Sequence, residues 1–236
     1  MTLTQYFLFL GQQKCGIFLA PNRHINKYGE SVSPHALPWH VRTQRYSFQD
    51  FLDCEKCGGT LISKRHVLTA AHCNHQDGQR IWVGQHTRKP MDGKAFKVCK
   101  VRSHPDYNQN RYDGYDFEIL HLEKDVVLDE TVQIACLPTK EDGLSDTFLD
   151  GKKLITSGWA AYESHNCSNQ LRSVELPGYS NERCQKESGY EAKGKINWED
   201  DRMKSILCAG ENGKDACVGD RGGNGFSFYS FANGPI

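Results

Sequence analysis

The sequence predicts an all-β protein built from two β-barrels that lie side by side, the second of them incomplete. Short apolar runs of strand length, such as Ile81-Trp-Val83, recur along the chain and are bounded by Gly, Pro, Asn and Asp. These runs form two groups, at about 35–125 and about 150–236, which the stretch near 125–150 joins. Helix signals are few, with one short candidate at 180–186 that begins at a capping serine.

The expected strands follow one another in both groups. In the first group they include Trp39–Val41, Gly59–Ile62, Val67–Leu68, Ile81–Val83 and Phe117–Leu122. In the second group they include Lys153–Thr156, Gly158–Trp159, Ser205–Leu207 and Phe226–Phe231. Turn residues separate them, as in antiparallel β structure.

Composition limits the functions that are open to this chain. Its 236 residues carry 29 Lys and Arg against 29 Asp and Glu, a balance that argues against nucleic acid or an anionic membrane surface as the main partner. No apolar run approaches the length of a membrane span. Ten cysteines, an even number scattered along the chain, favour disulfides and a secreted protein. We also expect a monomer that uses no cofactor.

The two ends of the chain are expected to differ from the main domain, which we assign to residues 25–236. Residues 1–24 are interpreted as a leader and propeptide, with Tyr6–Leu10 as a short apolar core of a signal peptide. Asn233 and Gly234 predict a hairpin turn, but no returning strand follows them. The C-terminus is therefore expected to be truncated, which would leave an unpaired strand edge.

The first chemical signal is a histidine beside a cysteine. His72 follows Thr-Ala-Ala and precedes Cys73, and an upstream strand begins with Cys57-Gly-Gly. One alternative is a surface histidine next to a structural cysteine. Another is a zinc site, because Cys54, Cys57, His72, Cys73 and His75 offer four or five ligands, although the strand-like segment between them fits such a site less well.

The second signal is an aspartate at the head of an alternating strand. Asp116 immediately precedes the run Phe117–Leu122. An aspartate at this place can be buried between two barrels and accept the N–H of His72, which orients the imidazole ring. Taken alone, such an aspartate is more often a turn residue, and Asp113 is a nearby alternative.

The third signal is a glycine-rich loop at residues 213–224. Gly219, Gly222 and Gly223 permit backbone turns that are closed to other residues. A loop of this kind can direct successive N–H groups at one point, as an oxyanion hole requires. The residue at the centre of the loop is Arg221.

Together these motifs resemble the trypsin/chymotrypsin-like serine proteases over about residues 34–236. The matching segments read Cys-Gly-Gly, Thr-Ala-Ala-His-Cys, Asp-Phe-Glu-Ile-Leu and Gly-Asp-Arg-Gly-Gly. The resemblance implies two six-stranded antiparallel barrels, with His72 as the general base and Asp116 as the residue that orients it. It also implies three disulfides, Cys57–Cys73, Cys15–Cys136 and Cys184–Cys208. Cys54 and Cys99 have no family partner, and a bridge between them is left open.

The resemblance also assigns roles to the glycine-rich loop. The N–H groups of Gly219 and Arg221 would form the oxyanion hole, and Asp215 would lie in a specificity pocket for Lys or Arg. The family motif Gly-Asp-Ser-Gly-Gly-Pro carries the nucleophilic serine where this chain has Arg221. Arginine has no nucleophilic oxygen, so we predict a catalytically inactive relative. Glu118 is a further departure, because the family has a small residue there.

Two other functions remain open. The chain is an active endopeptidase directed at Lys or Arg if Arg221 and the truncated end are errors of the sequence. It is a non-functional fragment if the missing strands prevent stable folding. For a folded protein, the expected partners are protein or peptide substrates, protease inhibitors or partner proteases.

Overall fold

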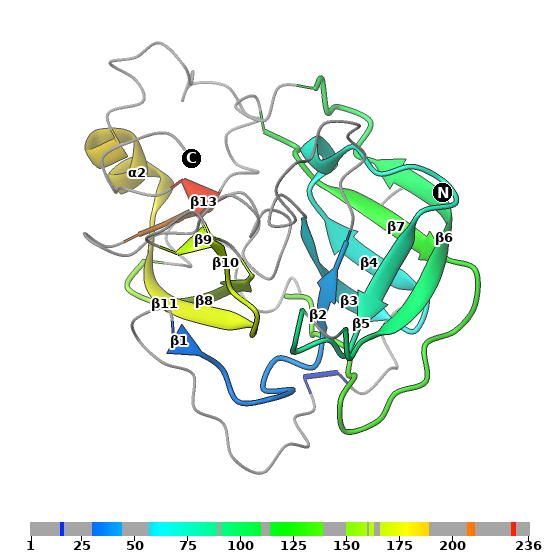
Figure 1. The fold of residues 1–236 in the computed structure, drawn as a ribbon. Coiled ribbons are helices and arrows are strands. Elements are labelled where there is room, and N and C mark those ends of the chain that lie inside the picture. Colours follow the sequence, from blue (N-terminus) through cyan, green and yellow to red (C-terminus); the bar gives the residue numbers. More distant parts are fainter. Residues whose placement is uncertain are drawn as a thin grey trace.

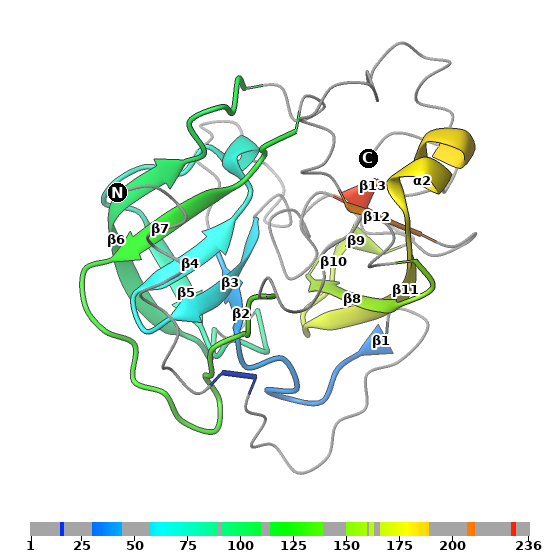
Figure 2. The same cartoon turned by 180° about the vertical axis from the view of Figure 1, so that it is seen from behind.

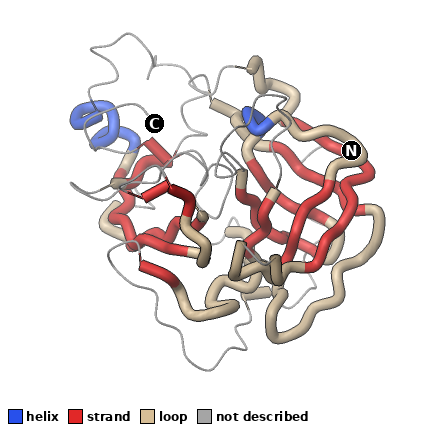
Figure 3. Tube along the Cα trace, viewed as in Figure 1, coloured by secondary structure: helices blue, strands red, loops and turns tan. Residues whose placement is uncertain are grey.

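The computed structural model places a β-barrel beside an open β-sheet (Figures 1 and 2). Nearly all of the regular structure in the described residues is β-strand (Figure 3). The described residues are 15–16, 30–43, 57–88, 91–109, 114–138, 150–159, 161–162, 166–188, 207–210 and 228–229.

The barrel is closed and has six antiparallel strands, which confirms the predicted first barrel. Around the barrel the order is β2-β3-β4-β7-β6-β5, and β5 pairs with β2 to close it. The strands are β2 (His40–Arg42), β3 (Gly58–Ser63), β4 (His66–Thr69), β5 (Arg80–Val83), β6 (Lys94–Ser103) and β7 (Glu118–Leu122).

Alternating side chains fill the inside of this barrel. On β6, Phe96 and Val98 are buried while Lys97 between them is exposed. Each fully buried apolar side chain of this size contributes about 1.5–3 kcal/mol, so the interior holds the six strands together. The core contains Val41, Leu61, Val67, Ile81, Val83, Phe96, Val98, Leu120, Leu122, Val126, Val132 and Ile134.

The second half of the molecule is an open five-stranded sheet in the described residues, not a closed second barrel. Its strands are β1 (Glu30–Ser31), β8 (Lys153–Gly158), β11 (Arg172–Tyr179), β12 (Leu207–Ala209) and β13 (Phe228–Tyr229). A separate antiparallel pair is formed by β9 (Ala161–Tyr162) and β10 (Asn166–Cys167).

One pairing in this sheet differs from the predicted antiparallel arrangement. β12 and β13 are parallel, with Leu207 opposite Phe228. A parallel pair needs a crossover connection of about a dozen residues or more, and residues 210–227 supply that length between the two strands.

Buried polar contacts join the barrel to the second sheet. The Nδ1 atom of His40 lies 3.0 Å from the Ser157 hydroxyl, and the His40 ring meets the Trp159 ring edge-on at 5.1 Å. The carbonyl of His86 accepts hydrogen bonds from the Trp159 indole at 3.1 Å and from the Leu171 N–H at 2.9 Å. These bonds fix how the two halves lie against each other.

The three predicted disulfides, Cys15–Cys136, Cys57–Cys73 and Cys184–Cys208, are confirmed. The suggested bridge between Cys54 and Cys99 is wrong, because Cys99 is a free, exposed thiol. Cys99 lies where the β6–β7 register shifts between Val98 and Lys100, which leaves its side chain on the outside of the barrel. Cys54 lies outside the described residues.

The single short helix expected from the sequence is present as α2 (Asn181–Ser188). Its first turn is capped by Ser180, whose hydroxyl accepts the N–H of Arg183 at 3.4 Å. No helix in the described part of the chain is both long enough and apolar enough to cross a membrane.

Candidate active site

His72 is presented by a tight turn after β4. The chain leaves β4 through Ala70 and forms a single 3₁₀ turn, η1 (Ala71–Cys73). Asn74 ends this turn in the left-handed conformation, with φ 55°, and its N–H binds the Ala71 carbonyl. The disulfide from Cys73 to Cys57 ties the turn to the start of β3. The backbone around His72 is therefore held from both sides.

Asp116 is presented by a turn before β7. Gly114 and Tyr115 both have positive φ angles, 78° and 54°, and the N–H of Phe117 binds the Tyr115 carbonyl at 2.8 Å. The Tyr115 ring stacks on His104, with ring centroids 4.5 Å apart and planes 3° from parallel. That stacking supports a left-handed conformation that is uncommon for a large side chain.

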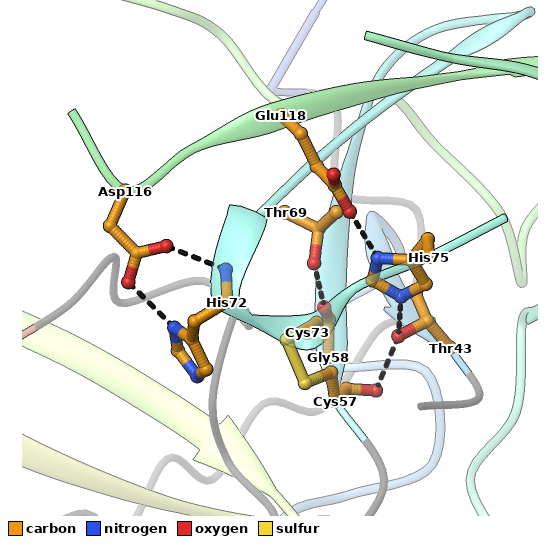
Figure 4. Close-up of a disulfide and its surroundings, with 9 residues drawn as sticks. All are labelled: Thr43, Cys57, Gly58, Thr69, His72, Cys73, His75, Asp116 and Glu118. Carbon is orange, nitrogen blue, oxygen red and sulfur yellow. Dashed lines mark hydrogen bonds and ion pairs between the residues drawn. A yellow bond between two sulfur atoms is a disulfide. The ribbon is translucent and has the colours of Figure 1, made fainter. Parts of the chain in front are cut away.

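The structure brings His72 and Asp116 together through two hydrogen bonds (Figure 4). The backbone N–H of His72 binds Oδ1 of Asp116 at 2.8 Å, and Nδ1 of the ring lies 2.6 Å from Oδ2. The aspartate side chain is 3% exposed and the histidine side chain 14%. An ionised carboxylate only accepts, so Nδ1 carries a hydrogen and Nε2 of the neutral ring is an acceptor. Nε2 has no hydrogen-bond partner among the described residues.

The glycine-rich loop lies outside the described residues. The predicted roles of Gly219 and Arg221 in an oxyanion hole, and of Asp215 in a specificity pocket, stay predictions. Asp113, the alternative to Asp116, is also outside the described residues. Within the described part of the chain, Asp116 is the carboxylate that binds His72.

Sequence reasoning missed a second histidine–carboxylate pair beside the first (Figure 4). Nδ1 of His75 makes a short contact with Oε1 of Glu118, and Nε2 lies 2.7 Å from the Thr43 hydroxyl. The His75 and Glu118 side chains are 0% and 2% exposed. Spacing is the signal that could have found this pair. His75 lies three residues after His72, and Glu118 lies two residues after Asp116.

The zinc alternative is wrong for the residues that the structure describes. The ligand atoms of Cys57, His72 and Cys73 do lie within 4.8 Å of one another. However, the two sulfur atoms form a disulfide and are not thiolates, the form of cysteine that binds a metal. The Nδ1 atom of His72 and both ring nitrogens of His75 are engaged in hydrogen bonds.

A buried aspartate that orients a histidine in this way allows the histidine to act as a general base toward a nucleophile. Comparisons with known proteins identify the family to which this fold and site belong. The trypsin family model matches residues 27–226. This chain belongs to the trypsin family.

Two relatives illustrate the similarity. The chain is similar to the clotting factor G beta subunit of Tachypleus tridentatus, with 33% identity over 224 residues, which is 91% of this chain and 69% of the relative. It is also similar to trypsin 5G1 of Aedes aegypti, with 36% identity over 172 residues, or 71% of this chain. That match spans 59% of the Aedes protein, which is less than two thirds of its length.

Proposed function

We propose that this chain is a secreted trypsin-family protein that binds protein or peptide ligands but does not cleave them. The observation that carries the proposal is Arg221. It stands where the family motif has its nucleophilic serine, inside the segment 27–226 that the family model matches. A histidine that acts as general base needs a hydroxyl or thiol to deprotonate, and arginine offers neither.

The rest of the machinery would still support recognition. His72 and Asp116 hold the geometry of a base and its orienting carboxylate. Loss of the nucleophile removes several orders of magnitude of turnover, while binding and the oxyanion hole are separate contributions. Suitable ligands are protein or peptide substrates, protein inhibitors of proteases, and partner proteases. Nucleic acid and membranes are not expected partners, given the balanced charge.

Secretion is proposed from the cysteines. Three disulfides among the described residues suit an oxidising compartment. Two relatives carry the names clotting factor G beta subunit and trypsin 5G1. Expression of the protein from its full-length transcript in a secreting cell tests this point, and we expect the disulfide-bonded chain in the medium. Retention inside the cell would contradict it.

A fluorophosphonate probe, which labels nucleophilic serines in this family, tests the proposed inactivity. We expect no labelling of the purified chain and clear labelling of the Arg221→Ser variant. Labelling of the unaltered chain would contradict the proposal.

Calorimetry with a reversible protein inhibitor of trypsin tests ligand binding, and we expect saturable binding at a one-to-one ratio. Failure of both the chain and its serine variant to bind would remove the binding role.

A second candidate function is proteolysis directed at Lys or Arg. It is favoured by the intact pairing of His72 with Asp116 and by an Nε2 atom that has no partner among the described residues. Asp215 would then select basic substrates. This candidate requires a serine at position 221, so sequencing the transcript across that codon decides it. A third candidate, a chain that does not fold stably, fails if the protein unfolds cooperatively on heating.

A further inference from the structure

The two histidine–carboxylate pairs connect the same two segments of the chain. His72 and His75 lie three residues apart in and after the turn, and Asp116 and Glu118 lie two residues apart along the entry to β7. Side chains two residues apart in an extended segment point to the same face, so both carboxylates face the turn. Figure 4 shows the pairs side by side, with the Cys57–Cys73 bridge next to them.

The second pair begins where the backbone ladder ends. Thr69 opposite Glu118 is the last registered pair between β4 and β7. Beyond this pair the chain after β4 turns away from β7. There, the hydrogen bonds between Asp116 and His72 hold the turn after β4 to the residues that precede β7. The contact between His75 and Glu118 lies where the β4–β7 ladder ends and the turn that carries His72 begins.

All four polar atoms of the second pair are engaged. Oε2 of Glu118 accepts from the Ser103 hydroxyl at 3.1 Å, while Oε1 contacts Nδ1 of His75. Nε2 of His75 lies 2.7 Å from the Thr43 hydroxyl, and that hydroxyl donates to the Cys57 carbonyl at 3.0 Å. Thr43 has a single hydrogen to give, so Nε2 of His75 must be the donor to Thr43. The pair itself is buried and its four polar atoms are engaged, which suits a fixed support and leaves none of these atoms for a substrate.

The proton count also makes the second pair neutral. With a hydrogen on Nε2 of His75, one further proton is shared between Nδ1 and Glu118. The pair is then either an imidazolium with a carboxylate or an imidazole with a carboxylic acid, and its net charge is zero in both cases. It therefore adds no net charge beside Asp116, where an unpaired carboxylate would repel that side chain.

We propose that His75 and Glu118 are positioning residues, which hold the His72 turn and the Asp116 turn in the register needed for their two hydrogen bonds. The proposal deepens the function proposed above, because it rests on His72 and Asp116 being the base and its orienting residue. It does not require the chain as written to be active.

Nuclear magnetic resonance of the full chain tests the positioning directly. We expect the proton on Nδ1 of His72 to give a far-downfield signal, because it lies in a 2.6 Å bond to the Asp116 carboxylate. We expect this signal to be lost or broadened in Glu118→Ala. We expect it to be retained in Glu118→Gln, whose amide N–H can donate to Nδ1 of a neutral His75 while its oxygen accepts from Ser103. The matched control is Val83→Ala, which empties part of the same barrel core on β5 and should leave the signal unchanged. A sharp, unshifted signal in Glu118→Ala would overturn the proposal.

A milder variant decides the matter if Glu118→Ala does not fold. Thr43→Val keeps the shape of the side chain but removes the acceptor of Nε2 in His75. We expect the His72 signal to broaden, and an unchanged signal in this folded variant would equally overturn the proposal.

Kinetics in the Arg221→Ser background separate this inference from the proposed function. There we expect Glu118→Ala to lower kcat about 100-fold with KM unchanged, because displacement of the base by about 1 Å has an effect of that size. Equal kcat in the two proteins would refute positioning. Absence of any activity in Arg221→Ser alone would count against Arg221 as the cause of the proposed inactivity, and the resonance experiment would still decide on positioning.

Discussion

The two histidine–carboxylate pairs differ in how many of their polar atoms have a hydrogen-bond partner and in how exposed their side chains are. In the pair of His75 and Glu118, every polar atom has a partner and the side chains are 0% and 2% exposed. In the pair of His72 and Asp116, the histidine is 14% exposed and its Nε2 atom has no partner among the described residues. A histidine bound to a carboxylate is therefore a saturated support in one place and, in the other, a base whose Nε2 atom has no partner among the described residues.

The difference shows which features of a buried pair indicate chemistry. Contact with a carboxylate is common to both histidines and so does not distinguish them. What distinguishes His72 is a ring nitrogen, Nε2, that has no partner among the residues described, and this is the atom that general-base catalysis uses. Substitutions in the two pairs should accordingly have opposite effects on stability and on chemistry.

The largest expected effect is on stability, from breaking the saturated pair. Glu118→Ala leaves the buried His75 without its carboxylate, and we expect the free energy of unfolding to fall by about 3–5 kcal/mol. His72→Ala should lower it by only about 1 kcal/mol, because Asp116 keeps its bond from the His72 backbone N–H. Urea unfolding of both variants measures the difference, and equal losses would contradict the comparison.

A double substitution sharpens this result. Replacing His75 and Glu118 together by leucine removes both polar groups, and the Thr43 hydroxyl keeps its bond to the Cys57 carbonyl. We expect the double variant to recover to within about 1 kcal/mol of the parent protein, as buried pairs replaced by apolar residues often do. A double variant as unstable as Glu118→Ala would show that the network stabilises the fold outright.

The contrast between the pairs also explains what could be predicted from the sequence. His72 and the three disulfides were predictable because the segments around them resemble motifs of the family, which imply the role of the histidine and the cysteine pairings. The pair of His75 and Glu118 was missed because no motif of the family links these two positions, and His75 was considered only as a possible zinc ligand. Glu118 was noticed only as a departure from a small residue, without the partner that explains it.

The fold shows the same limit. β6 escaped prediction because its charged outer face and the register shift near Cys99 hide the alternation of apolar residues. β11 escaped because it contains Pro177, which argues against a strand, yet this residue sits at the end of the ladder with β8, opposite Lys153. The first barrel was predictable from its short, clean strands, such as β3 and β5.

The next effect in size concerns the disulfide that ties the shared turn to β3. Cys57 and Cys73 are 16 residues apart, and a cross-link closing a loop of this length stabilises by about 3 kcal/mol. We expect the double alanine variant to lose that amount and also to weaken the bond of His72 to Asp116. Replacing Cys184 and Cys208, 24 residues apart in the second sheet, is the control. It should lower stability similarly without moving the His72 proton signal.

Acid should lower the stability of the barrel through His66, a half-buried histidine outside both pairs. Burial, with help from His121 and Arg65, lowers the pKa of His66 from 6.5 to about 4. Between these values the unfolded chain binds a proton that the folded chain does not, so stability is complete above pH 6.5 and is lost as the pH falls toward 4. We expect a loss of about 1 kcal/mol at pH 5, since the ring is partly solvated. Thermal unfolding at pH 7 and pH 5 measures it, and His66→Gln should reduce the difference.

The smallest effect tests whether saturation itself matters at Glu118. Ser103→Ala removes the 3.1 Å hydrogen bond to Oε2 but leaves the contact of Oε1 with His75. Because Ser103 is exposed, water can replace its hydroxyl, and we expect a loss of about 0.5–1 kcal/mol. Arg102→Ala, on the exposed face one residue earlier, is the matched control and should change little. If Ser103→Ala instead destabilised the protein as much as Glu118→Ala, the carboxylate would depend on Ser103 more than on His75, and the two pairs would not be comparable.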